Sequence, residues 1–141
     1  MRTTWPTDPR ALAEAAGPGW GGLWSLLYTA ERAVAALGQV VSFAEGMDLL
    51  WLGAELRQAA DDAARSHPGD VAAAVAVDLG PLSERDDATR ARRLLVGLVA
   101  AVIERADDLL AGDPPTDDAI ELTGIASMAF SIRIALTGGA R

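Results

Sequence analysis

The chain has 141 residues, twelve arginines, no lysine, 20 acidic side chains and a net charge of −8, with no cysteine and a single histidine. This composition excludes disulfides, thiolate and Schiff-base catalysis, cysteine-based zinc sites and, within one chain, multi-histidine metal sites. It also argues against nucleic acid as a partner, because neutralising phosphates requires a basic face.

A chain of this length can bury a core large enough to be stable without a disulfide or a metal. We therefore expect one domain over residues 1–141. Arginine supplies every cation and asparagine is absent as well, which we interpret as the coding bias of a GC-rich bacterial genome. The first six residues contain no hydrophobic signal core, so the expected location is the cytoplasm.

Residues 1–7 are expected to form a loose arm. Asp8 and Pro9 then give the cap and first-position signals of a short helix, which Gly17-Pro18-Gly19 ends after about Ala16. A long amphipathic helix of about 25 residues is predicted from Trp20, because apolar residues there keep a seven-residue repeat. The repeat comprises Leu23, Leu27, Ala30, Val34, Leu37, Val41 and Ala44.

Glu45-Gly46 is the predicted break before a third helix, which runs from about Met47 to Ser66. Its core stripe comprises Leu49, Leu52, Gly53, Leu56, Ala60 and Ala63. Trp51 lies about 140° around the helix axis from Leu56, at 100° per residue, and so points away from the stripe. Either this helix is buried on two sides, or Trp51 faces a partner.

Residues 70–79 are ambiguous between helix and strand. Val75 and Val77 alternate as in a strand, but no second strand is available for pairing, and a lone strand leaves its backbone groups unsatisfied. We predict a short helix over residues 71–79, capped by Asp70 and ended by Gly80-Pro81.

The ten residues from Leu94 to Ile103 are uncharged. The run is shorter than the roughly 20 residues that a membrane span needs, and its length favours a helix over a strand. We predict a helix that begins at a capping box of Ser83 and Asp86 and ends near Ala111. Because apolar residues surround most of its girth, the rest of the chain is expected to wrap around it.

The last helix is predicted to begin at Thr116, after Gly112-Asp113-Pro114-Pro115, and to end at Gly138-Gly139. Its core stripe comprises Ile125, Met128 or Ala129, Ile132 and Leu136. On another face Thr123, Ser127 and Ser131 step by four, beside Gly124. Small residues at this spacing let another backbone come close or face water, and both alternatives stay open. Together the elements predict an all-α fold, an antiparallel bundle of four main helices plus one or two short ones.

The candidate site residues are mostly aromatic. Trp20, Trp24 and Tyr28 step by four along one face of the second helix, and rings with a polar tip suit interfaces and pockets. The plainer explanation is a packing contact between the N-terminal arm and the bundle. With these three we select four further residues as candidates for an interface or pocket, namely Met47, Trp51, Met128 and Arg133. Arg133 lies between two isoleucines and is expected to meet a carboxylate from another helix or chain.

No catalytic residue, metal ligand or cofactor is predicted. A di-metal carboxylate bundle needs Glu-x-x-His motifs, which the chain lacks, and no glycine-rich phosphate loop follows a strand. We interpret the acidic residues as solvated faces.

The first functional hypothesis is a non-enzymatic interaction or accessory protein that self-associates or docks a protein partner through apolar helix faces. It rests on the last three long helices, each with more than one apolar face, more than a monomer of this size can enclose. The second hypothesis is a bundle that binds a small apolar ligand in a tryptophan-lined cavity. An enzyme that uses carboxylates as acid and base ranks last, and neither a membrane nor nucleic acid is expected as a partner.

Overall fold

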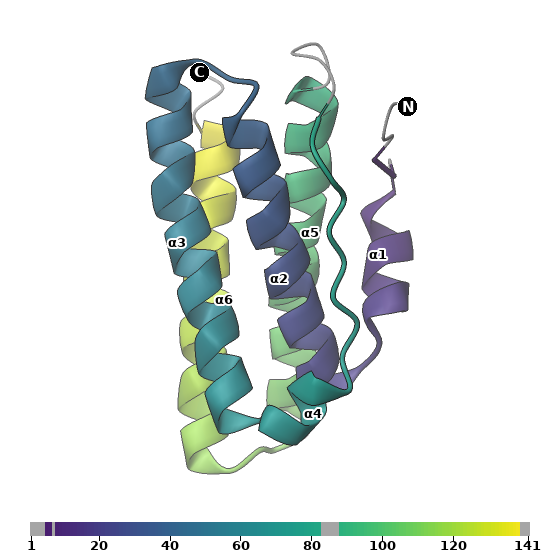
Figure 1. Cartoon of the computed structure of the whole chain (residues 1–141). Helices are drawn as coiled ribbons and strands as arrows, with labels where there is room; N and C mark the ends of the chain where they lie inside the picture. Colours follow the sequence, from purple (N-terminus) through teal and green to yellow (C-terminus); the bar gives the residue numbers. More distant parts are fainter. Residues whose placement is uncertain (1–4, 7, 83–87, 139–141) are drawn as a thin grey trace.

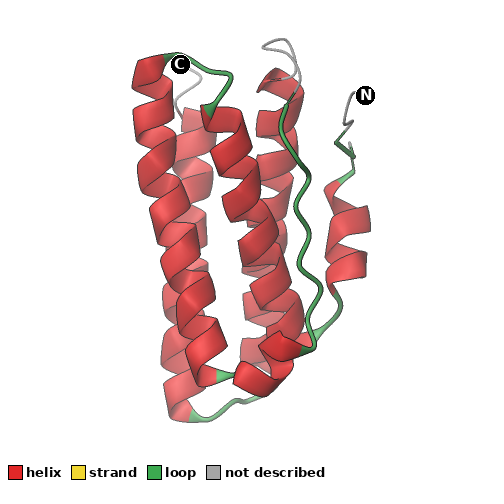
Figure 2. Ribbon diagram, in the orientation of Figure 1, coloured by secondary structure: helices red, strands yellow, loops and turns green. Residues whose placement is uncertain are grey.

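The computed structural model describes residues 5–6, 8–82 and 88–138. Within these ranges every regular element is a helix (Figure 2), which confirms the predicted all-α class. The helices are α1 (Pro9–Ala16), α2 (Gly19–Gly38), α3 (Phe43–Ser66), α4 (Pro68–Ala72), α5 (Ala88–Ala111) and α6 (Thr116–Gly138).

The four long helices lie side by side, with α2 and α3 in front of α5 and α6 in the view of Figure 1. α2 contacts α3 and α5, α6 contacts α5 and more sparsely α3, and α1 packs against α2 and α5. After α4 the chain turns at residues 73–74 and returns along the bundle through residues 75–82, which form neither helix nor strand. We call residues 73–82 the crossover segment.

The predicted bounds of α1 are confirmed. The Asp8 carboxylate accepts a hydrogen bond from the backbone N–H of Arg10 at 3.0 Å, Pro9 occupies the first turn, and Gly17 ends the helix with a φ of 81°. Asp8 thus satisfies one of the backbone donors that a helix start leaves free, and glycine adopts a left-handed conformation that other residues avoid.

The boundary between the second and third helices was predicted in the wrong place. α2 ends at Gly38 and α3 already begins at Phe43. The reason is Ser42, whose hydroxyl accepts a hydrogen bond from the N–H of Glu45 at 3.3 Å and caps α3. Val41 and Ala44 continue the apolar repeat of α2 in sequence, but they lie beyond its end.

The predicted helix over residues 71–79 is also wrong, because α4 ends at Ala72 and the crossover segment is not helical. Both backbone groups of Gly80 in this segment find side-chain partners without a second strand. The Trp5 indole N–H donates to the Gly80 carbonyl at 3.1 Å, and the Gly80 N–H donates to the Asp78 carboxylate at 2.9 Å. Trp5, part of the predicted loose arm, is only 8% exposed.

The centre of the core differs from the prediction. α5 buries seven residues, from Ala91 to Ala106, whereas the shorter α2 buries ten and contacts α1, α3, α4 and α5. α2 is therefore the most enclosed helix of the described chain, although the uncharged run from Leu94 to Ile103 led to the prediction that α5 lies at the centre. α5 ends at Ala111 as predicted, and the predicted capping box of Ser83 and Asp86 lies outside the described residues.

Candidate interaction surfaces

The large apolar side chains that remain exposed in the described residues gather on two helices. Apart from Val75 in the crossover segment, they lie on the first three turns of α3 and along α6. Those on α3 are Phe43, Met47, Leu50 and Trp51, which we call the α3 face; those on α6 are Ile120, Phe130 and Ile134. Single exposed apolar residues are ordinary, whereas residues grouped on one face indicate an interaction surface.

The α3 face is the side of the helix that α2 does not cover. Leu49 and Leu56 on the opposite side are buried, and Gly53 lets the helix lie close to Val34 of α2. Phe43 is 85% exposed and Trp51 is 73% exposed. The prediction that Trp51 points away from the core stripe of this helix is therefore confirmed.

A groove of about 680 Å³ lies between α2 and α3 next to this face. Three glycines, Gly38, Gly46 and Gly53, line it, and Phe43 and Met47 are among its apolar lining residues. The volume lies within the range of roughly 300–1,000 Å³ that is usual for small-molecule sites. No tryptophan lines this groove.

The exposed side of α6 carries no charge over most of its length, because eleven uncharged residues separate Glu121 from Arg133. Seven exposed residues make up this surface, which we call the α6 face: Ile120, Thr123, Gly124, Ser127, Phe130, Ser131 and Ile134. The opposite side of the helix is buried against the bundle through Leu122, Ile125, Ala129, Ile132 and Leu136.

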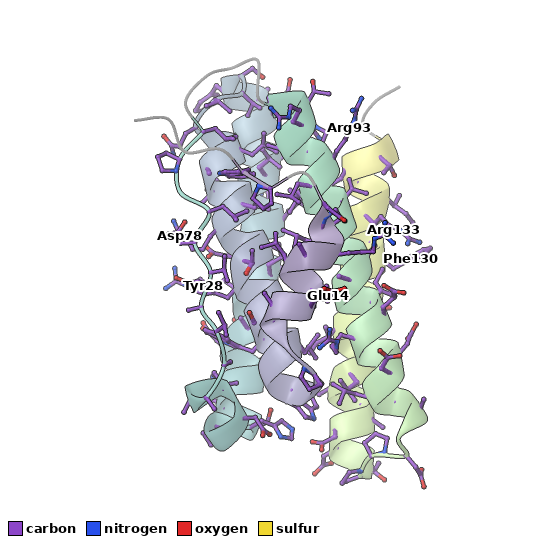
Figure 3. The ribbon with its side chains drawn as sticks, turned by 90° about the vertical axis from the view of Figure 1, so that its right-hand side faces the viewer. Glu14, Tyr28, Asp78, Arg93, Phe130 and Arg133 are labelled. Atoms are coloured by element: carbon purple, nitrogen blue, oxygen red, sulfur yellow. The ribbon has the colours of Figure 1, made fainter. Side chains whose placement is uncertain are left out.

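Arg133 borders the α6 face. Its guanidinium carbon lies 5.0 Å from the centre of the Phe130 ring, in the range of a cation–π contact. Figure 3 shows both side chains projecting from α6 away from the other helices. Within the chain Arg133 thus meets an aromatic ring, and the expected carboxylate, from another helix or from a second chain, stays a prediction.

The aromatic residues of α2 serve packing contacts. Trp20 stacks on His67 with 3.9 Å between the ring centres, and the His67 Nε2 lies 3.1 Å from an Asp118 carboxylate oxygen. Trp24 stacks on Tyr28 at 5.2 Å. Through Trp20, His67 and Asp118 these contacts connect α2, the end of α3 and the start of α6.

The seven candidate residues therefore lie in three places. Trp20, Trp24 and Tyr28 are half-buried on α2, and Met47 and Trp51 belong to the α3 face. Met128 is half-buried against the core, and Arg133 lies at the edge of the α6 face. Sequence reasoning missed Phe43, Leu50, Ile120, Phe130 and Ile134. Their signal was apolar character at helix positions away from the core stripe.

A second groove, of about 510 Å³, lies where α1, the start of α2 and α5 meet. Arg105 lines it, donates to the Ala13 carbonyl at 3.3 Å, and stands near the acidic residues Glu14 and Asp108. This arginine contacts the carbonyl end of α1, where a cation is favourable. We interpret the contact as part of the packing of α1.

No group of three or more histidine or acidic side chains in the described residues is arranged to hold a metal ion. One described helix, α6, is long and apolar enough to cross a membrane by length and composition alone. Such a helix is also typical of the interior of a soluble protein.

No family model matches this chain, and neither a curated protein nor a solved structure is significantly similar to it. The functional argument therefore rests on the surfaces described above.

Proposed function

We propose that this protein is a non-enzymatic interaction or accessory protein, an antiparallel bundle of four main helices that self-associates or docks a protein partner through apolar helix faces. The observation that carries the proposal is the grouping of exposed large apolar side chains on the α3 face and the α6 face. Covering one such side chain contributes about 1.5–3 kcal/mol.

The chemistry of the chain supports binding more than catalysis. It has one histidine and neither lysine nor cysteine, and His67 is engaged by Trp20 and Asp118. The net charge of −8 favours a neutral or basic protein over nucleic acid as a partner.

A cytoplasmic location belongs to the same proposal. α6 has the length and composition of a membrane span, but Leu122 and Ile132 are fully buried against the rest of the chain. α6 buries one side in a protein core, and on its other side hydroxyl-bearing residues stand among the apolar ones. This pattern supports a protein partner over lipid.

Light scattering at increasing dilution tests the proposal. The wild type is expected to exceed the monomer mass, and polar substitutions on its faces are expected to reduce that mass. Suitable variants are Phe43→Ser with Trp51→Gln for the α3 face and Ile120→Gln with Ile134→Gln for the α6 face, and Thr89→Gln, exposed on α5, is the control. A clean monomer of ordinary stability at all concentrations would count strongly against the proposal.

A second candidate function is the binding of a small apolar molecule, favoured by the groove between α2 and α3. It differs from the predicted tryptophan-lined cavity, since Met47 is the only one of the seven candidate residues that lines it. Gly38→Leu should fill the groove without a clash, because a β-carbon at Gly38 has no neighbour within 4 Å.

Titration with 1-anilinonaphthalene-8-sulfonate tests this second function. Gly38→Leu should weaken binding of the dye, whereas Gly69→Leu, at another uncrowded helical glycine outside the groove, should not. Equal binding by wild type and Gly38→Leu would contradict the groove as the ligand site.

A further inference from the structure

Five residues of the α6 face, together with Gly138 at the end of the helix, form a regular seam. Its positions step along the helix by four, three, four, three and four residues, the spacing at which helices meet in coiled coils. The seam residues are Ile120, Gly124, Ser127, Ser131, Ile134 and Gly138, all exposed or partly exposed and none charged.

The seam positions are placed symmetrically about the level of Ala129, and each isoleucine has a glycine at its mirror position. If an identical helix is laid against it in the opposite direction, Ile120 meets Gly138 and Gly124 meets Ile134 of the other copy, while Ser127 meets Ser131. Every isoleucine is thus opposite a glycine, and the two hydroxyl-bearing residues are opposite each other. A surface that fits its own copy in this way is what a two-fold symmetric interface requires.

We propose that α6 pairs in antiparallel orientation with α6 of a second copy of this chain, about a two-fold axis near Ala129. This inference rests on the proposed function and assigns one of its two faces to self-association. We favour a second copy of this chain as the partner, because the side-chain sizes along the seam are complementary to those of the same seam read in the opposite direction. An unrelated apolar helix would have no reason to show the same reversed order.

The space around the seam glycines agrees with a close approach of another backbone. A β-carbon built at Gly124 or Gly138 has no neighbour within 4 Å in its own chain. Helices with small residues at the contact can approach to about 8 Å between axes. The glycines therefore leave hollows that the protein itself does not fill and that an isoleucine of the second copy would occupy.

Electrostatics favour the same face. Each chain carries a net charge of −8, so two copies repel one another, and the repulsion is weakest where the facing surfaces are uncharged and the charges stay far apart. Glu121 beside the seam already accepts a hydrogen bond from the Ser66 hydroxyl at 2.8 Å. At the two-fold axis the flanking residue is Phe130, which would meet Phe130 of the second copy while Arg133 contacts its ring.

The size of the contact indicates the protein concentrations at which the dimer should form. The seam extends about 27 Å along the helix at 1.5 Å per residue. A single helix pair lies at or below the lower end of specific interfaces, which bury about 1,200–2,000 Å² in total. The dimer should therefore be sought by sedimentation velocity from about 1 µM to about 1 mM.

Gly124→Leu tests the seam without risk to the fold, because its side chain has open space in the monomer and leucine favours a helix. It should collide with Ile134 of the second copy and raise the dimer dissociation constant at least about 100-fold. Adding Ile134→Ala to Gly124→Leu reverses the sizes and should restore most of the affinity. Gly69→Leu in α4 is the matched control and should leave the dimer unchanged.

Cross-linking between introduced cysteines tests the orientation of the two helices. Because the sequence has no native cysteine, only the introduced ones can react. In an antiparallel pair the two copies of residue 120 lie about 27 Å apart along the axis, whereas residue 124 lies beside residue 134 of the second copy. A short bis-maleimide linker should therefore join Gly124→Cys to Ile134→Cys in a mixture and should fail with Ile120→Cys alone. Efficient cross-linking of Ile120→Cys to itself would contradict the antiparallel arrangement.

The outcomes separate this inference from the broader proposal. A wild-type oligomer that survives Gly124→Leu but dissociates with Phe43→Ser and Trp51→Gln would overturn the α6 pairing and leave the interaction function standing. A monomer at every concentration would overturn the pairing and count against the function as well. Flotation of monomeric wild type with phosphatidylcholine vesicles would assign the α6 face to a lipid surface and overturn the pairing.

Discussion

α2 and α6 are built from similar residues and have different surroundings. α2 is uncharged from Gly19 to Ala30, and α6 is uncharged between Glu121 and Arg133. Yet α2 contacts four other helices and buries ten residues, whereas α6 contacts α5 and α3 and keeps a whole face exposed. An apolar helix sequence therefore indicates that the helix has a face to bury. The position of the helix in the fold decides whether other helices of the same chain bury that face.

The glycines of the two helices express the same difference. A β-carbon at Gly22 of α2 would collide with the backbone carbonyl of Gly17 and with the Arg105 side chain. A β-carbon at Gly124 of α6 would meet nothing within 4 Å. Gly22 permits a close contact with other residues of the same chain. Gly124 has no such neighbour and leaves room for a contact with another molecule.

The largest expected effect comes from removing side-chain volume on each helix. Leu27 of α2 is fully buried, so Leu27→Ala should lower the free energy of unfolding by about 2–5 kcal/mol. Ile134 of α6 is 53% exposed, and Ile134→Ala should change it by about 0.5 kcal/mol or less.

Urea denaturation at low micromolar protein concentration measures both values, since dilution limits any contribution from self-association. A loss of more than about 2 kcal/mol for Ile134→Ala at this dilution would mean that α6 is covered within the monomer. The comparison between the two helices would then fail.

A smaller effect, of opposite sign on the two helices, is expected for glycine-to-alanine substitutions. Gly22→Ala should destabilise the fold by about 1–3 kcal/mol through overpacking. Gly124→Ala should stabilise the monomer by about 0.5–1 kcal/mol, because alanine loses less entropy than glycine in a helix. Thermal unfolding followed by circular dichroism reports both shifts, and a destabilising Gly124→Ala would show that its surroundings are not open.

A third effect, smaller than those of Leu27→Ala and Gly22→Ala, is expected at the end of the bundle where α6 is attached. His67→Ala removes the stacking on Trp20 and the contact with Asp118, and should cost about 1–2 kcal/mol. Asp118→Asn keeps the size of the side chain and a hydrogen-bond acceptor, and should cost less. If both variants unfold like the wild type, the link between α2 and α6 through His67 contributes little to the position of α6.

Much of the fold followed from local signals. Asp8, Pro9 and the glycines after Ala16 predicted α1, and the apolar stripes placed most of the buried residues of α3 and α6 and half of those of α2. The errors arose where a short polar contact outweighed a periodic pattern. Ser42 restarts the helix although Val41 and Ala44 continue the apolar repeat, and its spacing from Glu45 was a readable capping signal.

The crossover segment was harder to predict because its partners are distant in sequence. The Gly80 carbonyl accepts its hydrogen bond from Trp5, and Leu79 and Leu82 pack against the core. No local pattern reports such contacts, so the argument from unpaired backbone groups favoured a helix.

The candidate surfaces followed only in part from the sequence. Trp51 could be placed outside the core stripe by helix geometry, and the small residues of α6 at four-residue spacing were noted as open to either close packing or water. The exposure of Phe43 and Phe130 depends on which neighbours each helix acquires. That information lies in the tertiary arrangement.

The contacts of the N-terminal segment bear on synthesis at the ribosome. Trp5 donates to the carbonyl of Gly80, and Pro9 fits against Gly97 of α5 so closely that a β-carbon there would clash. During synthesis this segment can therefore dock only after residues 80 and 97 have been made. Until then the Trp5 indole and the apolar side of α1 lack the contacts that bury them in the folded chain, so the growing chain exposes more apolar surface than the finished fold.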